Sequence, residues 1–142
     1  MEFVNIEIKG PFCPGQDMQA AFVLLMDSLR RFHCADRTIL SSFGHSWLKE
    51  FHERYPFVRT GLLYSETYTP EETVAFVRKY GAWGIHPDFH CIDAITVEFC
   101  RKAGIACNLW TVDSPEMIRQ AIAYQPTGII TNYPDRVLAQ LL

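Results

Sequence analysis

Long apolar runs, runs of basic residues and an excess of positive charge are all missing from this chain of 142 residues. Its longest apolar run, residues 20–26, is far shorter than the ~20 residues that cross a bilayer. The first residues include Glu2, Glu7 and Lys9, where a signal peptide needs an apolar stretch. Lys and Arg total 13 against 16 Asp and Glu, a formal net charge of -3. We therefore expect a globular chain with no membrane span and no nucleic-acid partner.

Cysteine is present, but not in the patterns that bind zinc or form a disulfide framework. The five cysteines are odd in number and scattered, and they form no Cys-x-x-Cys pair. They indicate reduced thiols, a cytoplasmic location, and for most of them a place in the core as small apolar residues. The five are Cys13, Cys34, Cys91, Cys100 and Cys107.

Short apolar segments alternate with amphipathic ones along the whole chain. Strands are predicted at residues 3–8, 38–42, 58–64, 83–86, 105–112 and 128–131. Helices are predicted at residues 17–32 and 45–54, from Thr69 to Gly81, on a face marked by Ile92, Ile95 and Phe99, from Ser114, and from Pro134 or Asp135. Thr69 and Glu72 form a capping box with Pro70 at the first helical position. The pattern therefore predicts six β/α units.

Six strands that alternate with helices predict a parallel sheet with right-handed crossovers. An open nucleotide-binding sheet usually carries a glycine-rich turn, and this chain has neither G-x-G-x-x-G nor a P-loop. A (β/α)₈ barrel is favoured, although it needs eight units and about 250 residues. The predicted fold is thus an incomplete α/β barrel of the TIM type, one domain over residues 1–142. The two missing units are expected to precede Met1.

Glu7 and Lys9 are the charged residues at the end of the first predicted strand. Side chains two apart on a strand share a face, so both point to the same side. If that side is the barrel lumen, the pair suits a divalent cation on Glu7 and a phosphate on Lys9. If it is the surface, the pair is a solvated salt bridge. The pattern alone leaves both interpretations open.

Five segments fall in an order that resembles the glycerophosphodiester phosphodiesterase family, along essentially the whole chain. They are Asn5-Ile6-Glu7-Ile8-Lys9, Ser41-Ser42-Phe43, Gly61-Leu62-Leu63, Asn108-Leu109-Trp110-Thr111-Val112 and Gly128-Ile129-Ile130-Thr131-Asn132-Tyr133-Pro134-Asp135. An unrelated barrel enzyme would have to match all five by coincidence. The resemblance implies the C-terminal three-quarters of that family's barrel.

The family hydrolyses glycerophosphodiesters to glycerol 3-phosphate and an alcohol, with a divalent metal (calcium or magnesium) and histidine acid/base catalysis. By resemblance, Glu7 corresponds to a metal-binding glutamate and Lys9 to the lysine on the phosphate side. Trp110 corresponds to the tryptophan that lines the glycerol side, and Phe43 stands where an aromatic residue walls the pocket. Thr131 and Asn132 end the last predicted strand, and we expect a structural role for them.

The family's His-Arg-Gly, Glu-x-Asp and downstream His-Asp motifs are absent from this chain. They supply both catalytic histidines and most metal ligands, and one carboxylate cannot hold calcium or magnesium tightly. The chain alone is therefore predicted to be nearly inactive. Among the local histidines, His45 is the best stand-in, although its position also suits a helix start. Whether Tyr64 or His86 enters the pocket is left open by the sequence.

A second hypothesis is a non-catalytic fragment, scaffold or phosphate-binding module that completes its barrel by association. The partner would be a second copy or a separate N-terminal segment. A partial barrel would expose the edges of the strands predicted at residues 3–8 and 128–131, which favours oligomers. The sequence does not distinguish between these hypotheses, nor does it define the head group of a substrate.

Overall fold

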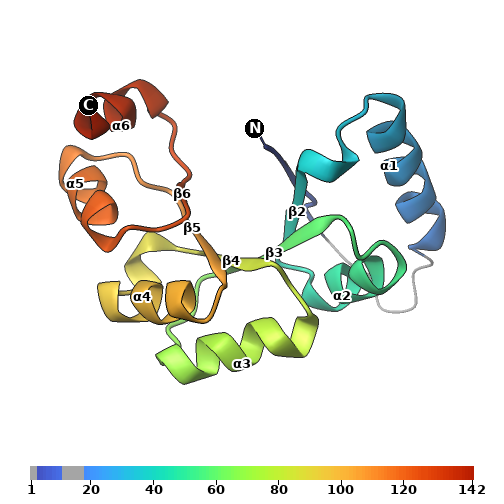
Figure 1. Ribbon diagram of the computed structural model, residues 1–142, viewed down its shortest axis with the longest axis horizontal. Helices are drawn as coiled ribbons and strands as arrows, with labels where there is room; N and C mark the ends of the chain where they lie inside the picture. The colour runs from blue at the N-terminus through green and yellow to red at the C-terminus, as the bar shows by residue number, and fades with distance from the viewer. Residues whose placement is uncertain (1–2, 11–17) are drawn as a thin grey trace.

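The computed structural model describes residues 3–10 and 18–142, which form one parallel sheet of six strands flanked by helices (Figure 1). The strands lie side by side in the order in which they occur in the chain, as the six predicted β/α units require. They are β1 (Val4–Glu7), β2 (Thr38–Ser42), β3 (Arg59–Tyr64), β4 (Gly84–Pro87), β5 (Ala106–Leu109) and β6 (Gly128–Ile129).

Each strand is followed by an α-helix on the outside of the curved sheet (Figure 1). The six are α1 (Gln19–Arg31), α2 (His45–Arg54), α3 (Pro70–Tyr80), α4 (Ala94–Lys102), α5 (Pro115–Tyr124) and α6 (Pro134–Leu141), with short 3₁₀ turns at Ala35–Arg37 and Phe89–Cys91. Residue 17, where the first helix was predicted to start, and Cys13 lie outside the described residues. The structure otherwise confirms the predicted sequence of strands and helices.

Two predicted strands, β5 and β6, are half as long in the structure as in the sequence pattern. β5 was predicted over residues 105–112, but its ladder ends at Leu109. Beyond it, Trp110 forms a single bridge with Asp88, and its N–H donates to the carbonyl of Pro87. β6 has only two residues. The apolar pattern continues past the end of each ladder because those residues still pack or hydrogen-bond in the loops.

The apolar face predicted for α4 is not the face that is buried. Ile95 is 71% exposed and Phe99 is 37% exposed, whereas Thr96, Val97 and Cys100 are the buried positions. The side chain of Asp93 accepts a hydrogen bond from the Thr96 N–H, which fixes the helix start. The helix lies on the sheet with positions 96, 97 and 100 facing it.

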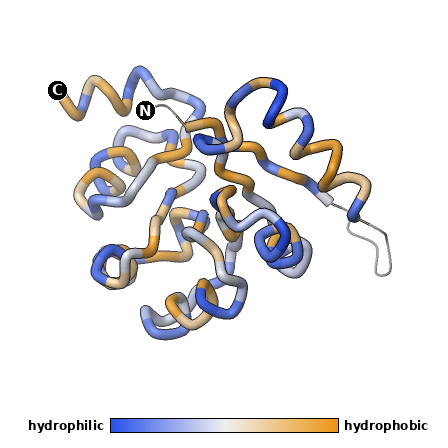
Figure 2. Tube along the Cα trace, turned by 45° about the vertical axis from the view of Figure 1, so that its right-hand side comes forward, coloured by the Kyte–Doolittle hydropathy of each residue, from blue (hydrophilic) through white to orange (hydrophobic). Residues whose placement is uncertain are grey.

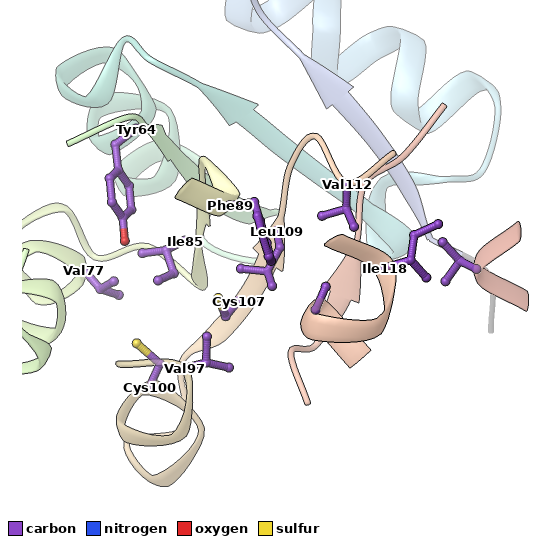
Figure 3. Close-up of a cluster of buried hydrophobic side chains, with 12 residues drawn as sticks. Tyr64, Val77, Ile85, Phe89, Val97, Cys100, Cys107, Leu109, Val112 and Ile118 are labelled. Atoms are coloured by element: carbon purple, nitrogen blue, oxygen red, sulfur yellow. The ribbon is translucent and has the colours of Figure 1, made fainter. Parts of the chain in front are cut away.

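Alternate strand residues point outward and pack beneath the helices, where they form two core clusters. Figure 2 shows apolar and hydrophilic residues alternating along each helix. Figure 3 shows the first cluster, in which Ile85 and Leu109 from the strands meet Val97 and Ile118 from the helices. The second cluster includes Phe22, Leu40, Leu48, Phe51 and Leu62. The outward face is thus filled, and the residues that face inward are free to form a site.

The sheet is a partial barrel, because among the described residues β1 and β6 each pair with a strand on one side only. At the start of β1, Phe3 and Val4 are 47% and 40% exposed. The guanidinium of Arg59 lies 4.8 Å from the centre of the Phe3 ring. Across residues 3–10 and 18–142, no helix has the length and apolar character needed to span a membrane.

Candidate functional site

The carboxyl ends of the strands surround a hollow of about 270 Å³. In a barrel this is the end where loops can bring functional side chains together. The hollow contains all four site residues predicted from the sequence, Glu7, Lys9, Phe43 and Trp110. The other lining residues are Asn5, Ser41, Leu63, His86, Thr111 and Ile130.

Glu7 and Lys9 share the inner side of β1, as their spacing predicts. Ile6 and Ile8 turn to the other side and pack against the second core cluster. Both charged side chains are exposed, and within the described residues neither forms an ion pair. The structure therefore does not contain the solvated salt bridge of the alternative interpretation. It places one carboxylate and one ammonium group on the wall of the hollow.

Asn5 is a pocket residue that the sequence reasoning did not single out. Its Nδ2 donates a hydrogen bond to Oγ of Ser41 at 3.1 Å, which ties β1 to β2 on the inner side. The signal was present in the sequence, since Asn5, Glu7 and Lys9 follow one another at the strand period of two.

Phe43 and Trp110 form an aromatic wall of the hollow. Their ring centroids are 5.9 Å apart and their planes are nearly perpendicular at 84°, a favourable edge-to-face arrangement. Nε1 of Trp110 donates a hydrogen bond to the backbone carbonyl of His86 at 2.6 Å. The indole is therefore anchored to β4, while Phe43 is 51% exposed.

His86 is a buried residue of the inner face, and it does line the hollow. Nδ2 of Asn108 donates to its Nε2 at 2.9 Å. A Cβ atom on Gly61 would lie only 2.5 Å from the same Nε2, so the ring requires glycine on β3. Burial lowers the pKa of His86 to about 4, so the imidazole is neutral at pH 7.

His45 and Tyr64 do not line the hollow. Nε2 of His45 donates to the carbonyl of Leu63 at 2.6 Å, and its ring packs against Phe76 and Tyr80. Tyr64 is buried in the first core cluster, and burial raises the pKa of its hydroxyl. The structure gives both residues packing roles, so His45 is not a stand-in for a catalytic histidine.

Asp113 joins the last two loops at this edge, and the sequence reasoning missed it. Its carboxylate accepts hydrogen bonds from Oγ1 of Thr131 at 3.0 Å, from the N–H of Asn132 at 2.9 Å and from Nδ2 of Asn132 at 2.8 Å. The bonds from Asn132 in particular lower the pKa of Asp113. Thr131 and Asn132 therefore have the structural role expected for them.

The described residues do not form a complete metal site. No group of three or more His, Cys, Asp or Glu side chains in this part of the chain could hold a metal ion. Among the described residues, Glu7 is the single carboxylate that lines the hollow, whereas calcium takes six to eight oxygen ligands and magnesium takes six. The residues present therefore do not by themselves fit a tightly bound divalent cation.

A model of the Glycerophosphoryl diester phosphodiesterase family matches residues 4–136. The chain belongs to this family. Enzymes of the glycerophosphodiester phosphodiesterase family are generally metal-dependent. One relative, the glycerophosphodiester phosphodiesterase of Caldanaerobacter subterraneus subsp. tengcongensis, is 31% identical over 137 residues, which cover 95% of this chain and 54% of that protein.

Solved structures of the family have the same fold as this chain. A glycerophosphodiester phosphodiesterase from Parabacteroides distasonis superimposes with a TM-score of 0.83 at 25% identity, over 98% of this chain and 57% of that one. An Oleispira antarctica phosphodiesterase in complex with the product sn-glycerol-3-phosphate gives a TM-score of 0.72 at 15% identity, over 84% of this chain and 48% of that one. The predicted barrel fold is confirmed.

The chain spans about half the length of the curated relatives it matches. This share is smaller than the three-quarters expected from six of eight β/α units. Outside the matched region, these relatives therefore have more residues than two β/α units at the spacing seen here would contain. Unit lengths in a barrel vary with the loops.

Proposed function

We propose that this chain forms the half of a glycerophosphodiester phosphodiesterase site that holds the phosphoglycerol part of the substrate. The observation that carries the proposal is the convergence of Glu7, Lys9, Phe43 and Trp110 on one hollow. These residues come from three separate strand ends, so their meeting is a property of the fold. The family of the chain gives the reaction class, hydrolysis of a glycerophosphodiester to glycerol 3-phosphate and an alcohol.

The chemistry of the hollow suits a ligand with one charged and one less polar end. The Lys9 ammonium neutralises charge on phosphoryl oxygens, both in the ground state and as charge develops during hydrolysis. Trp110 and Phe43 offer apolar surface to the glycerol carbons. Each of the two walls therefore recognises a different part of a phosphoglycerol ligand.

Hydrolysis also needs groups that the described part of the chain does not place in the hollow. The lining histidine, His86, is buried and neutral, and His45 lies outside the hollow. Glu7 is the proposed ligand for calcium or magnesium, since a carboxylate suits such hard cations, but one carboxylate is too few. We therefore expect this chain alone to bind the ligand and to hydrolyse little of it. Turnover would require two further β/α units in the same barrel domain.

A second candidate function is a non-catalytic scaffold or phosphate-binding module that acts by association. It is favoured by the single-sided pairing of β1 and β6 and by the exposure of Phe3 and Val4. Edges of this kind pair readily with other chains. The partner would be a second copy of the chain or the remaining segment of the barrel.

The cellular setting follows from the same proposal. Hydrolysis of small glycerophosphodiesters would give the chain a place in lipid metabolism. A cytoplasmic location is supported by the free state of the described cysteines, which are Cys34, Cys91, Cys100 and Cys107.

The deciding experiment measures binding and turnover on the same purified chain. Binding of glycerol 3-phosphate is followed by calorimetry, and its release from glycerophosphocholine is assayed with calcium, with magnesium and with chelator. We expect Lys9→Gln to weaken binding by roughly tenfold to a hundredfold, because a charge-assisted contact is lost. Lys49→Gln is the matched control, since Lys49 is an exposed lysine on α2.

The outcomes separate a working enzyme from a chain that only binds the ligand. Metal-dependent release that disappears in Glu7→Gln would show that the chain assembles a working site, contrary to our expectation of little turnover. Binding without release would support a half-site or a phosphate-binding module. If glycerol 3-phosphate does not bind to the folded chain, the proposed function is wrong.

A further inference from the structure

The inner face of β4 carries a polar group that the proposed roles do not use. His86 is only 1% exposed, yet it lines the hollow together with Leu63, its partner in register on β3. Its Nδ1 atom is buried and has no hydrogen-bond partner among the residues that the structure describes. Buried polar side chains without a partner are rare in native proteins, and one in a pocket wall points to a ligand.

The neighbours of His86 decide which nitrogen carries the proton. Nδ2 of Asn108 can only donate, so Nε2 of His86 accepts and holds no proton. The neutral ring must then carry its proton on Nδ1. Gly61 lies directly against the Nε2 edge of the ring, which keeps the imidazole in place. His86 is thus a fixed, uncharged N–H donor.

We propose that the Nδ1–H of His86 donates a hydrogen bond to a hydroxyl oxygen on the glycerol part of the ligand, with Asn108 as the positioning residue. This rests on the proposed function and adds the group that selects the glycerol end. Lys9 belongs to β1, three strands away from β4, so the phosphate and the glycerol are recognised on different walls. Trp110, the proposed glycerol wall, is bonded to the backbone carbonyl of His86 itself.

Nδ1 is covered by its surroundings, so a ligand oxygen reaches it only when a neighbouring side chain shifts. Leu63 and Trp110 line the same hollow beside His86, and the indole of Trp110 is held to the His86 carbonyl. A donor buried in this way favours a ligand that carries the matching oxygen, because that oxygen gives the N–H the partner it lacks in the free chain. The expected consequence is selectivity for a hydroxylated ligand.

The test compares glycerol 3-phosphate with n-propyl phosphate, which has the same phosphate and carbon chain but no hydroxyl groups. Calorimetry on the 142-residue chain should give glycerol 3-phosphate roughly tenfold tighter binding than n-propyl phosphate. His86→Phe should remove most of that preference, because it weakens the binding of glycerol 3-phosphate more than the binding of n-propyl phosphate. Asn108→Ala should reduce the preference only in part, because the ring remains but its tautomer is no longer fixed.

A second measurement needs no variant. ¹⁵N NMR of the imidazole should report the proton on Nδ1, and its Nδ1 signal should shift with glycerol 3-phosphate but not with n-propyl phosphate. A proton on Nε2, or a folded His86→Phe chain that keeps the full preference, overturns the inference while the proposed function stands. Failure of both ligands to bind the unaltered chain overturns the proposed function, and this inference with it.

Discussion

Gly61, which has no side chain, helps to shape the hollow. Gly61 on β3 leaves room for the imidazole of His86, which then meets Asn108 on β5. The sequence placed Gly61 within a motif, but the reason for glycine lies in a residue 25 positions later. A contact of this kind depends on the register between β3 and β4, which no local pattern encodes.

We expect Gly61→Ala to destabilise the fold by about 1–3 kcal/mol, because the new Cβ overlaps the His86 ring. The free energy of unfolding, measured in urea, checks this value. The double variant Gly61→Ala, His86→Ala should recover part of the loss relative to the sum of the two single variants. Strict additivity of the two changes would contradict the proposed overlap.

Asp113 gives a pH-dependent prediction. Hydrogen bonds from Asn132 lower the pKa of its carboxyl group in the folded state. Its contribution to stability is therefore present above the unfolded carboxyl pKa of about 3.9, and is lost as the pH falls through the lower folded value. Urea unfolding should show Asp113→Ala less stable than the parent chain at pH 7, with a smaller difference at pH 3. A difference that does not change with pH would argue against the role given to the carboxylate.

At the scale of helices and strands, the best predictions came from local signals. β2 and α2 have the predicted bounds, and α3 begins after Thr69 and ends before Gly81, as its caps indicated. The buried face of α4 could not be predicted, because Ile95 and Phe99 follow the helical period as well as the observed face does. The choice between the two faces depends on how the helix sits on the sheet.

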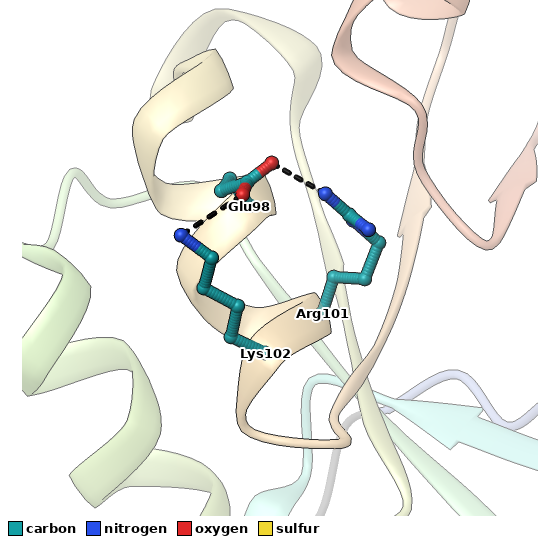
Figure 4. A network of polar contacts seen from close by, with 3 residues as sticks. All are labelled: Glu98, Arg101 and Lys102. Atoms are coloured by element: carbon teal, nitrogen blue, oxygen red, sulfur yellow. Dashed lines mark hydrogen bonds and ion pairs between the residues drawn. The ribbon is translucent and has the colours of Figure 1, made fainter.

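The caps should contribute more to stability than surface ion pairs. In α3, Thr69 accepts a hydrogen bond from the Glu72 N–H, and the Glu72 carboxylate accepts one from the Thr69 N–H. We expect Thr69→Ala to lower the free energy of unfolding by about 1 kcal/mol. The comparison is Glu98→Gln on α4, where Glu98 pairs with Arg101 and Lys102 at the surface (Figure 4). Exposed pairs contribute little, so a larger effect of Glu98→Gln than of Thr69→Ala would be contrary to this view.

For the molecule as a whole, the main feature is the open barrel with its unpaired strand edges. Its outward face is covered by helices, but β1 and β6 each lack one neighbour among the described strands. Exposed apolar residues lie beside β1 and on α6, where Leu138 and Leu141 are 60% and 59% exposed. A chain with such edges gains stability by pairing.

We expect the purified chain to associate as its concentration rises, and size-exclusion chromatography with light scattering can measure this. Val4→Lys places a charge on the exposed edge strand β1 and should shift the population toward monomer. Ile95→Lys is the control, because Ile95 is apolar and, at 71%, even more exposed than Val4, but lies on α4 and not on an edge strand. A monomer at every concentration, or an equal effect of the two variants, would contradict association through β1.

The sequence by itself determined the order of the six β/α units, the shared face of Glu7 and Lys9, and the capping box that starts α3. All of these depend on residues close together in the chain. The tertiary structure decided that His86 lines the hollow, whereas Tyr64 is buried in the first core cluster. It also decided that His45 forms a hydrogen bond with Leu63 and that Asp113 joins two loops. These outcomes follow from strand register and barrel curvature, which bring together residues far apart in the sequence.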